Sequence, residues 1–356
     1  VIDRAIYPEG HPYRWQVIGS LADLDAATVD DAKAFHADWY GPNNATLVIA
    51  GDIDVAETRA WIETYFGEIP SRSLPERPEI PEVALSASTL LYHEDNYARL
   101  PALTMAWPTV ERFHPDAYPL DVLAQLLTSG KSTPFYDVVV EEDQVAPGAN
   151  AGHGTQELAG RFTLRTTAYD GTNLDDVKAS FDRAFQRFEE QGVIASELER
   201  VKAGTETGFY GGLSSAIGKA FSLADYAIFA GDPGYLQEDL DRTLGVTAAD
   251  VMRVYETYIK DQPYVATSFV PRGQADLALT GSARAEVVEE PIVLGAEEAF
   301  TVVRGDELTP VGSFDRSVEP AYGEAPTLSA PTVGRAELAN GVQVLSIQDD
   351  EIPLVQ

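Results

Sequence analysis

A helix–turn–strand pattern between residues 28 and 52 constrains the fold of this chain most. Thr28 and Asp31 predict a capped helix start, because their oxygens can accept the first backbone N–H groups of a helix. The helix carries an apolar stripe at helical spacing, formed by Ala32, Phe35, Trp39 and Tyr40. Turn formers at 41–44 then lead into the apolar run 47–50, which predicts a strand buried on both faces.

The same pattern returns near the other end of the chain. Thr247 and Asp250 predict a second capped helix, which is followed by a turn and a strand over 264–270. Its apolar stripe consists of Val251, Val254, Tyr255 and Tyr258. So long a period indicates two related domains rather than a solenoid, whose repeats run about 20–50 residues. The alternative is a chance likeness between two common helix–turn–strand units.

Composition shifts divide the chain into five predicted parts. These are the C-terminal portion of a truncated α+β domain at 1–70, a proline-rich linker at 71–86, a second α+β domain at 87–275, a long tether at 276–334 and the start of a third domain at 335–356. The first part has a second helix, Val55 to Phe66, but lacks the other strands that a sheet needs.

Residues 87–275 predict one sheet covered on one face by helices. The expected strands are 89–94, 102–107, 146–152, 161–167 and 264–270. The expected helices are 116–127, 134–142, 174–191, 196–209, 214–230, 235–240 and 248–259.

The tether is far longer than the usual connection of a few residues. It indicates a hinge between two halves that open and close, and a plain spacer is the alternative. A short strand is expected at 300–303. After the turn at Asn340-Gly341, the strand Val342–Ile347 lacks a predicted partner. We therefore expect it to be disordered or to be borrowed as an added strand.

The chain of 356 residues carries 57 acidic against 25 basic side chains, a net charge of −32. This charge argues against binding nucleic acid and against anionic membrane surfaces. No stretch approaches the ~20 apolar residues of a membrane span. The acidity indicates a solubility surface, as in a saline habitat, or an acidic cavity that attracts basic peptides.

The absence of Cys excludes disulfides and thiolate catalysis, so the redox compartment cannot be inferred. The sequence begins at Val1 without an initiating Met, so we expect the N-terminal targeting region to be missing. The compartment is therefore unknown, and a bacterial periplasm is a guess.

The five histidines, His11, His36, His93, His114 and His153, show none of the spacings of a zinc helix. His93, Glu94 and Asp95 form the densest local cluster, but neighbours on a strand face opposite ways and cannot share a metal. His11 and His36 are expected to pack or to hydrogen-bond. The sequence therefore predicts no metal site and no catalytic residue in this chain.

Three further patterns receive structural interpretations. Residues 129–132 end like a phosphate-binding loop, but Gln125 stands where that loop requires its first glycine, so nucleotide binding is excluded. Glu141, Glu142 and Asp143 form an acidic run at a helix end, which favours a solvated turn although such acids are unfavourable there. Glycines where two helices meet, Gly208, Gly211 and Gly212, indicate a helix break or close packing.

Several stretches together resemble the pitrilysin/insulinase-type zinc peptidases over nearly the whole chain except the tether. They are residues 7–13 with 17–20, 40–45 with 51–52, 65–70, 127–136, and 192–193 with 197–199. The resemblance implies repeated α+β domains, each with a mainly antiparallel sheet covered on one face by helices, in halves that close around a peptide.

The resemblance also implies zinc in the full-length protein, held by two His and a distal Glu, with the Glu of H-x-x-E-H as general base. These residues would lie upstream of Val1, and none falls on a residue here. The family's zinc-free half supplies an Arg and a Tyr near a helix-to-strand step, but those places hold Val140 and Pro147. The chain thus resembles either the rear of a zinc-bearing half or part of a non-catalytic half.

Two functions follow from the resemblance. The first is a fragment of a zinc-dependent endopeptidase that encloses and hydrolyses peptides and is inactive alone. The alternative is a non-catalytic peptidase-like module that completes a partner's chamber or binds peptides. The expected partners are peptide substrates and either the other half of the polypeptide or a partner subunit, with no nucleic acid and no membrane span. The substrate-binding residues are unknown from the sequence.

Overall fold

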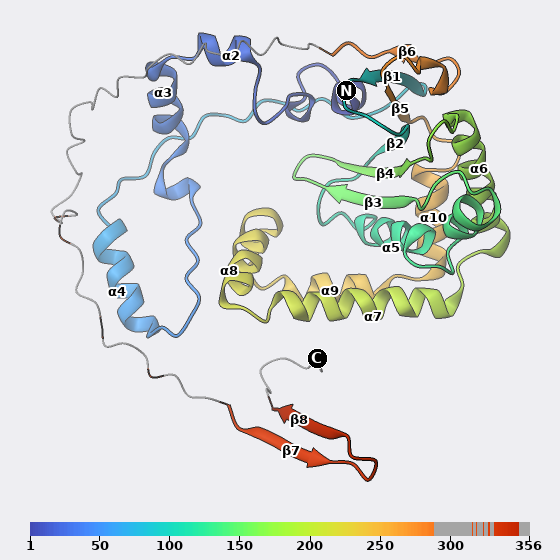
Figure 1. Cartoon of the computed structure of the whole chain (residues 1–356). Helices are drawn as coiled ribbons and strands as arrows, with labels where there is room; N and C mark the ends of the chain where they lie inside the picture. The colour runs from blue at the N-terminus through green and yellow to red at the C-terminus, as the bar shows by residue number, and fades with distance from the viewer. Residues whose placement is uncertain (288–314, 316–317, 319–322, 324–326, 328–330, 349–356) are drawn as a thin grey trace. The chain divides into compact units, whose positions relative to one another are not determined.

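The structure is a computed structural model of the chain (Figure 1). It describes residues 1–287 and 331–348, with the isolated positions 315, 318, 323 and 327. The chain divides into two compact units. The first holds the described parts of Val1–Ala32, Glu76–Glu206 and Asp225–Leu294, and the second holds those of Lys33–Pro75, Thr207–Ala224 and Gly295–Gln356.

A six-stranded sheet forms the centre of the first unit, in the order β3-β4-β2-β5-β1-β6. Its strands are β1 (Thr89–Asp95), β2 (Ala102–Thr109), β3 (Asn150–Thr155), β4 (Gly160–Thr167), β5 (Val265–Pro271) and β6 (Ala283–Arg284). The pairs β3–β4, β4–β2 and β2–β5 are antiparallel, whereas β1 runs parallel to β5 and to β6. The mainly antiparallel sheet that the resemblance implied is confirmed.

Helices cover one face of this sheet and build the main core. They are α5 (Ala117–Thr128), η3 (Tyr136–Glu142), α6 (Leu174–Gln191), α7 (Ala195–Gly212), η4 (Tyr226–Ala230), α9 (Leu236–Gly245) and α10 (Ala248–Tyr258). Alternate strand residues enter this layer, so Leu103 on β2 and Phe162 on β4 are fully buried beside Phe181 of α6. This α+β layer agrees with the fold class expected from the sequence.

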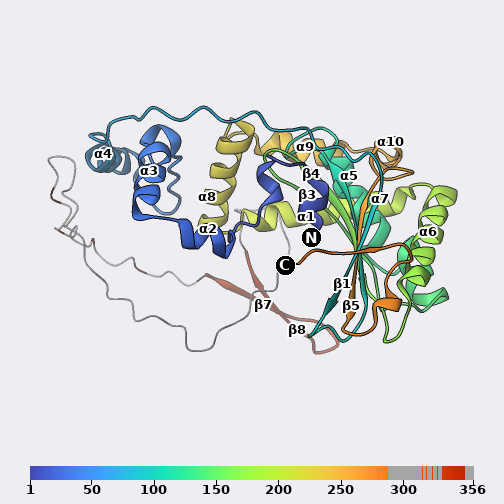
Figure 2. The ribbon, with the colours of Figure 1, turned by 90° about the horizontal axis from the view of Figure 1, so that it is seen from above.

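The opposite face of the sheet carries the N-terminal segment, with α1 (Ile2–Ile6) and η1 (Pro12–Arg14). Figure 2 shows α1 and α6 on opposite sides of the strands. Ile6 and Tyr7 pack with Ala106 and Val265 in a small second cluster. The sequence assigned residues 1–70 to a domain of their own, whereas these first residues pack on the sheet.

The sheet also continues past residue 275, where the sequence placed the start of the tether. A short turn, η5 (Ala275–Leu277), leads into β6, which pairs with β1. The Thr280 N–H donates to Asp175 on α6 at 2.9 Å, and the Ala285 N–H donates to the Tyr92 carbonyl at 2.7 Å.

The bounds of several predicted elements differ in the structure, as two examples show. The strand expected at 146–152 begins only at Asn150, because Pro147 has no N–H to give to a ladder. The helix expected at 214–230 is divided into α8 (Ala216–Asp225) and η4.

The second unit contains α3 (Val29–Trp39) in large part, η2 (Pro42–Asn44), α4 (Val55–Phe66) and α8. The helix start at Thr28 and the bounds of α4 agree with the sequence, but the predicted strand at 47–50 is wrong. No strand of the described residues pairs with this run, and Leu47 is 54% exposed. An apolar run alone does not make a strand, because its backbone groups need a neighbouring strand.

The expectation that Val342–Ile347 is disordered, or is borrowed as an added strand by the first-domain fragment or by a neighbouring molecule, is also wrong. It forms β8 (Gln343–Ile347), which pairs antiparallel with β7 (Val333–Glu337). Gly341 has φ +83°, a conformation that glycine adopts without strain, and it closes the predicted turn. The strand expected at 300–303 lies outside the described residues.

Candidate functional site

Strand β3 is a terminal strand of the sheet, and no other strand of the described residues pairs with its outer edge. The Ala151 N–H donates to the Thr128 hydroxyl of α5 at 2.9 Å, so Ala151 faces away from β4. Because backbone directions alternate along a strand, His153 and Thr155 also point their N–H and C=O groups away from β4. Such groups can pair with a further extended chain.

One face of β3 is bare of side chains at Gly152 and Gly154, next to Asn150 on the same face. These glycines pair with Thr163 and Arg161 on β4, on the face opposite to Phe162. A Cβ atom built at either glycine would meet no atom within 4 Å. The backbone of β3 is therefore accessible from this face as well as from its edge.

A groove of about 710 Å³ runs beside this bare face. One side is β3 with the adjoining part of β4, and the other comes from the N-terminal segment, with Tyr7, Tyr13, Trp15 and Val17. Trp15 is 63% exposed although it is a large apolar side chain. Exposed aromatic groups beside a free strand edge are typical of a protein or peptide contact.

His11 holds Tyr7 and Tyr13 in place on the aromatic side of the groove. Its imidazole is fully buried, stacks on the Tyr7 ring at 4.8 Å and accepts the Tyr13 N–H at Nδ1 over 3.1 Å. The Tyr13 hydroxyl in turn accepts the Leu158 N–H at 3.0 Å, next to the β3–β4 turn. Burial lowers the pKa of His11. Because Nδ1 accepts the Tyr13 N–H, the neutral ring carries its proton on Nε2.

An ion pair between Asp3 and Arg161 closes the base of the groove, with 2.5 Å between Oδ1 and Nη1. Both side chains are partly exposed, at 46% and 37%. The pair therefore adds little charge of either sign to the groove, and it joins α1 to β4.

The imidazole of His153 lies on the other face of β3, away from the groove. Its Nδ1 is 3.0 Å from Asp121 Oδ1 on α5, and its Nε2 is 3.0 Å from Thr109 Oγ1 on β2. A hydroxyl, an imidazole and a carboxylate in this order resemble a nucleophile with its base. The imidazole is fully buried, however, so we interpret the three side chains as a clamp that joins β3 to β2 and α5.

The other histidines support the structural interpretation. His36 is exposed and stacks on Tyr40 at 5.1 Å, His93 lies 5.6 Å from the Phe269 ring, and His114 Nδ1 accepts the Asp116 N–H at 3.0 Å. Within the described residues, no three His, Cys, Asp or Glu side chains form a group that could hold a metal ion. The family's zinc therefore does not fit the residues described, and the absence of a metal site from the chain stays a prediction.

The acidic run at the end of η3 forms ion pairs with α6 and is not merely solvated. Glu142 pairs with Arg187 of α6 at 2.7 Å, and Asp143 pairs with Arg183 of the same helix. The hydrogen bond from Arg187 lowers the pKa of Glu142. These arginines offset the repulsion between carboxylates and a helix C-terminus.

The structure also places the remaining positions that the sequence analysis singled out. Residues 129–132 follow α5, not a strand, and the Ser129 carbonyl accepts from Arg200 at 2.9 Å. Val140 is half-buried in η3 and Pro147 is exposed in the loop before β3. Gly208, Gly211 and Gly212 lie in the last turns of α7, just before the break to α8.

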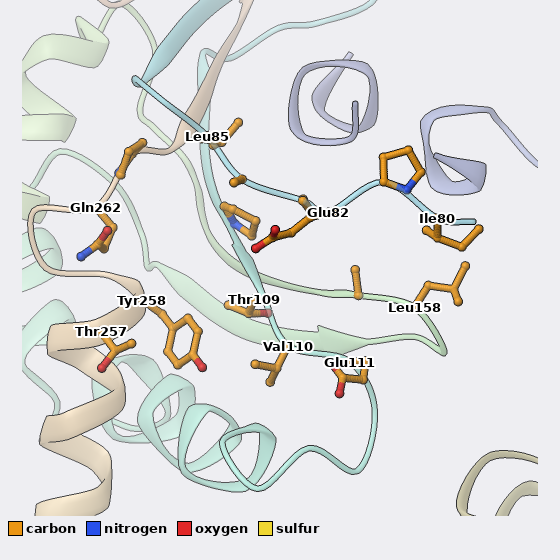
Figure 3. Close-up of a pocket in the computed structure, with 16 residues that line it drawn as sticks. Ile80, Glu82, Leu85, Thr109, Val110, Glu111, Leu158, Thr257, Tyr258 and Gln262 are labelled. Atoms are coloured by element: carbon orange, nitrogen blue, oxygen red, sulfur yellow. The ribbon is translucent and has the colours of Figure 1, made fainter. Parts of the chain in front are cut away.

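A further cavity of about 550 Å³ lies between the extended segment 80–85 and the end of β2. Figure 3 shows Glu82 on that segment and Tyr258 on α10 at different walls. The Tyr258 hydroxyl already donates to Asp116 at 2.8 Å. Thr109, which also lines this cavity, belongs to the His153 clamp described above. We therefore prefer the outer edge of β3 as the candidate site.

Sequence reasoning did not find the β3 groove. The available signal was the alternation of Gly152 and Gly154 with larger residues, which is typical of close backbone approach. The expected strand, 146–152, ended at Gly152 and left Gly154 outside, so this alternation was not recognised.

Several solved structures have a similar fold. The peptidase M16 inactive domain from Pseudomonas fluorescens has a TM-score of 0.64 at 20% identity, over 75% of this chain and 63% of its own. The periplasmic protease PqqL from Escherichia coli has a TM-score of 0.61 at 15% identity, over 76% of this chain and 30% of its own. At these identities the likeness shows a shared fold.

A family model described as the peptidase M16 inactive domain matches residues 26–205, about half of the chain. The chain therefore belongs to the M16 peptidase family, the pitrilysin/insulinase-type peptidases.

A zinc protease of Helicobacter pylori, PqqE, is 24% identical over 258 residues, which cover 70% of this chain and 57% of that protein. The chain thus spans just over half the length of this relative. Within the part of the chain that the structure describes, no helix is both long and apolar enough to cross a membrane.

Proposed function

We propose that this chain is the non-catalytic, peptide-holding part of a zinc-dependent endopeptidase, and that an extended peptide adds to β3 as a further strand. The observation that carries the proposal is the outward backbone of His153 and Thr155 beside the groove. Main-chain hydrogen bonds would hold the peptide whatever its sequence, and the groove would select its side chains.

The alternation of side chains along an added peptide strand determines which of them would enter the groove. Every second residue of an added strand would point over the glycine face, toward Tyr13 and Trp15. The glycines leave room there for a large apolar side chain. Since Asp3 and Arg161 neutralise each other, the groove itself favours neither acidic nor basic peptides.

Zinc would supply the hydrolytic chemistry from a segment outside this sequence. The described residues contain no group that fits the metal, while a relative is named a zinc protease. The zinc-bearing segment would then hydrolyse the peptide, and this chain would bind and orient it.

The test is peptide binding measured by fluorescence anisotropy, with a labelled, proline-free peptide of about ten residues. Thr155→Pro removes an outward N–H and should weaken binding about tenfold, the cost of roughly one hydrogen bond. Gly152→Val fills the groove beside β3 and should weaken binding by at least as much.

Gly148→Val is the matched control, because Gly148 precedes β3 and its Cβ would also meet no atom within 4 Å. It should bind the peptide as the unaltered chain does. Equal affinity in all four proteins would contradict the proposal.

The alternative role, completion of a partner's chamber, is favoured by the match to a model described as inactive. A quenched peptide assay addresses catalysis directly. We expect the isolated chain to leave the peptide intact, and chelator-sensitive cleavage by the pure chain would contradict a non-catalytic role.

A further inference from the structure

Arg165 on β4 is an exposed side chain on the same face of the sheet as the β3 groove. Side chains alternate along a strand, so Arg165 shares its face with Arg161 and Thr163, which both line the groove. The intervening residues Phe162 and Leu164 are fully buried on the other face, under the helices. The guanidinium of Arg165 therefore belongs to the groove face, two residues beyond the groove lining.

No carboxylate of the described residues neutralises this guanidinium. Arg161 pairs with Asp3, whereas the side chain of Arg165 has neither an ion pair nor a hydrogen bond within the described part of the chain. Its partners across the ladders are uncharged, with Thr104 on β2 and Asn150 on β3. Arg165 thus offers a charge that a carboxylate of another molecule can match.

Gly152 leaves a clear path from Arg165 to a peptide that adds to the outer edge of β3. It pairs with Thr163 on β4, and a Cβ atom built on it would meet no atom within 4 Å. An added strand would lie two strand spacings from β4, about 10 Å away. The long side chains of an arginine and a glutamate together span such a gap. A peptide residue opposite Gly152 is therefore within reach of the guanidinium.

The other end of the glycine face has a different character. Gly154 pairs with Arg161, whose charge is already matched within the chain. The nearby β3–β4 turn is joined to an aromatic ring, because the Tyr13 hydroxyl accepts the Leu158 N–H at 3.0 Å. A large apolar side chain suits this end. Since Gly152 and Gly154 are two residues apart, alternate residues of one peptide strand would lie over the two ends.

We propose that Arg165 makes the site selective for peptides with an acidic residue two positions from a large apolar residue. The inference rests on the proposed function, because it requires a peptide paired with β3. The apolar side chain lies over Gly154, and the acidic side chain crosses Gly152 to pair with Arg165. The net charge of −32 opposes this pair only weakly, because salt screens exposed charges beyond about 8 Å.

Fluorescence anisotropy with labelled, proline-free peptides tests this selectivity. Each peptide carries a phenylalanine and, two residues later, a glutamate, a glutamine or a lysine. A second set has the reverse order, because an added strand can run in either direction along β3. In one of the two sets we expect the glutamate peptide to bind about threefold more tightly than the glutamine peptide, the effect of an exposed ion pair. The lysine peptide of that set should bind most weakly.

Charge changes at Arg165 should redirect the preference. Arg165→Gln should abolish it, and Arg165→Glu should reverse it, so that the lysine peptide binds most tightly. Arg284→Glu is the matched control, because it makes the same charge change at an exposed position of β6, the terminal strand at the opposite edge of the sheet. It should keep the order of affinities of the unaltered chain.

Equal binding of the glutamate, glutamine and lysine peptides by the unaltered chain would overturn this inference and leave the proposed function standing. An unchanged order in Arg165→Glu would also overturn it, as would the same reversal in Arg284→Glu. If no peptide of either set binds, the proposed function and this inference both fail.

Discussion

At the scale of single residues, His11 determines how the N-terminal segment forms one side of the groove. A neutral imidazole can stack on Tyr7 and accept from the Tyr13 N–H at the same time. Protonation would place a donor at Nδ1 against that N–H and would put a charge on a fully buried side chain. The sequence correctly indicated packing for His11, because no metal-ligand spacing surrounds it.

The lowered pKa of His11 gives stability a defined pH dependence. The unfolded chain takes up a proton near the ordinary pKa of 6.5, while the folded chain binds it only at lower pH. The stabilisation is therefore complete above pH 6.5 and declines as the pH falls toward the folded pKa. We expect urea unfolding between pH 7.5 and 5 to show this loss, as the uptake of about one proton per molecule on unfolding.

His11→Asn is the matched variant, because asparagine can accept the Tyr13 N–H as a helix cap but does not titrate in this range. Its stability should lack this component of the pH dependence. An identical pH profile in both proteins would exclude His11 as the titrating group.

His153 gives a second prediction at this scale. Replacing its buried, doubly bonded ring by alanine should lower the free energy of unfolding by about 2–4 kcal/mol, through a cavity and lost hydrogen bonds. Asp121→Asn should cost under about 1 kcal/mol, because Asp121 is 56% exposed. Urea denaturation checks both, and similar costs for the two changes would contradict the clamp.

At the scale of elements, helices were predicted better than strands. The start of α10 could be predicted because Thr247 and Asp250, which form a reciprocal capping box, are close together in the sequence. The same exchange joins Thr28 and Asp31 at the start of α3. Strands depend on distant partners, so the run at 47–50 failed while β5, flanked by β1 and β2, formed. The β3 groove likewise joins segments distant in sequence, which local patterns do not reveal.

The two capping boxes should differ in what they contribute to stability. Thr247→Ala should lower the free energy of unfolding by about 1 kcal/mol, because α10 buries Val251, Val254 and Tyr255 in the core. Thr28→Ala should change it little, because α3 has no buried residue among those described. Thermal unfolding followed by circular dichroism compares the pair, and equal losses would contradict this assignment.

The stability of the β7–β8 hairpin should depend on its turn. Gly341→Ala places a Cβ at φ +83° and should open the hairpin, because a two-stranded hairpin is only marginally stable. Hydrogen exchange should show faster exchange over 343–347 in the variant and no change over β4. Unchanged exchange over 343–347 would indicate that another segment holds β8.

At the scale of the whole molecule, the predicted domain boundaries stay predictions. The structure indicates at which residues a protease should cut if they are right. Val83 and Leu85 pack against the small cluster under α1. Of the linker at 71–86, the part before Ile80 should therefore be cut first. We expect a glutamate-specific protease to cut early at Glu76 and within 276–334. Early cuts at Glu189 or Glu190 inside α6 would contradict an autonomous domain at 87–275.

The central claim is that an extended peptide pairs with the outer edge of β3. Amide hydrogen exchange at single-residue resolution, with and without saturating peptide, measures this pairing most directly. The claim predicts slower exchange at the amides of His153 and Thr155, which face away from β4, with little change at Gly152 and Gly154, which face it. Bound peptide without slower exchange at His153 and Thr155 would contradict it.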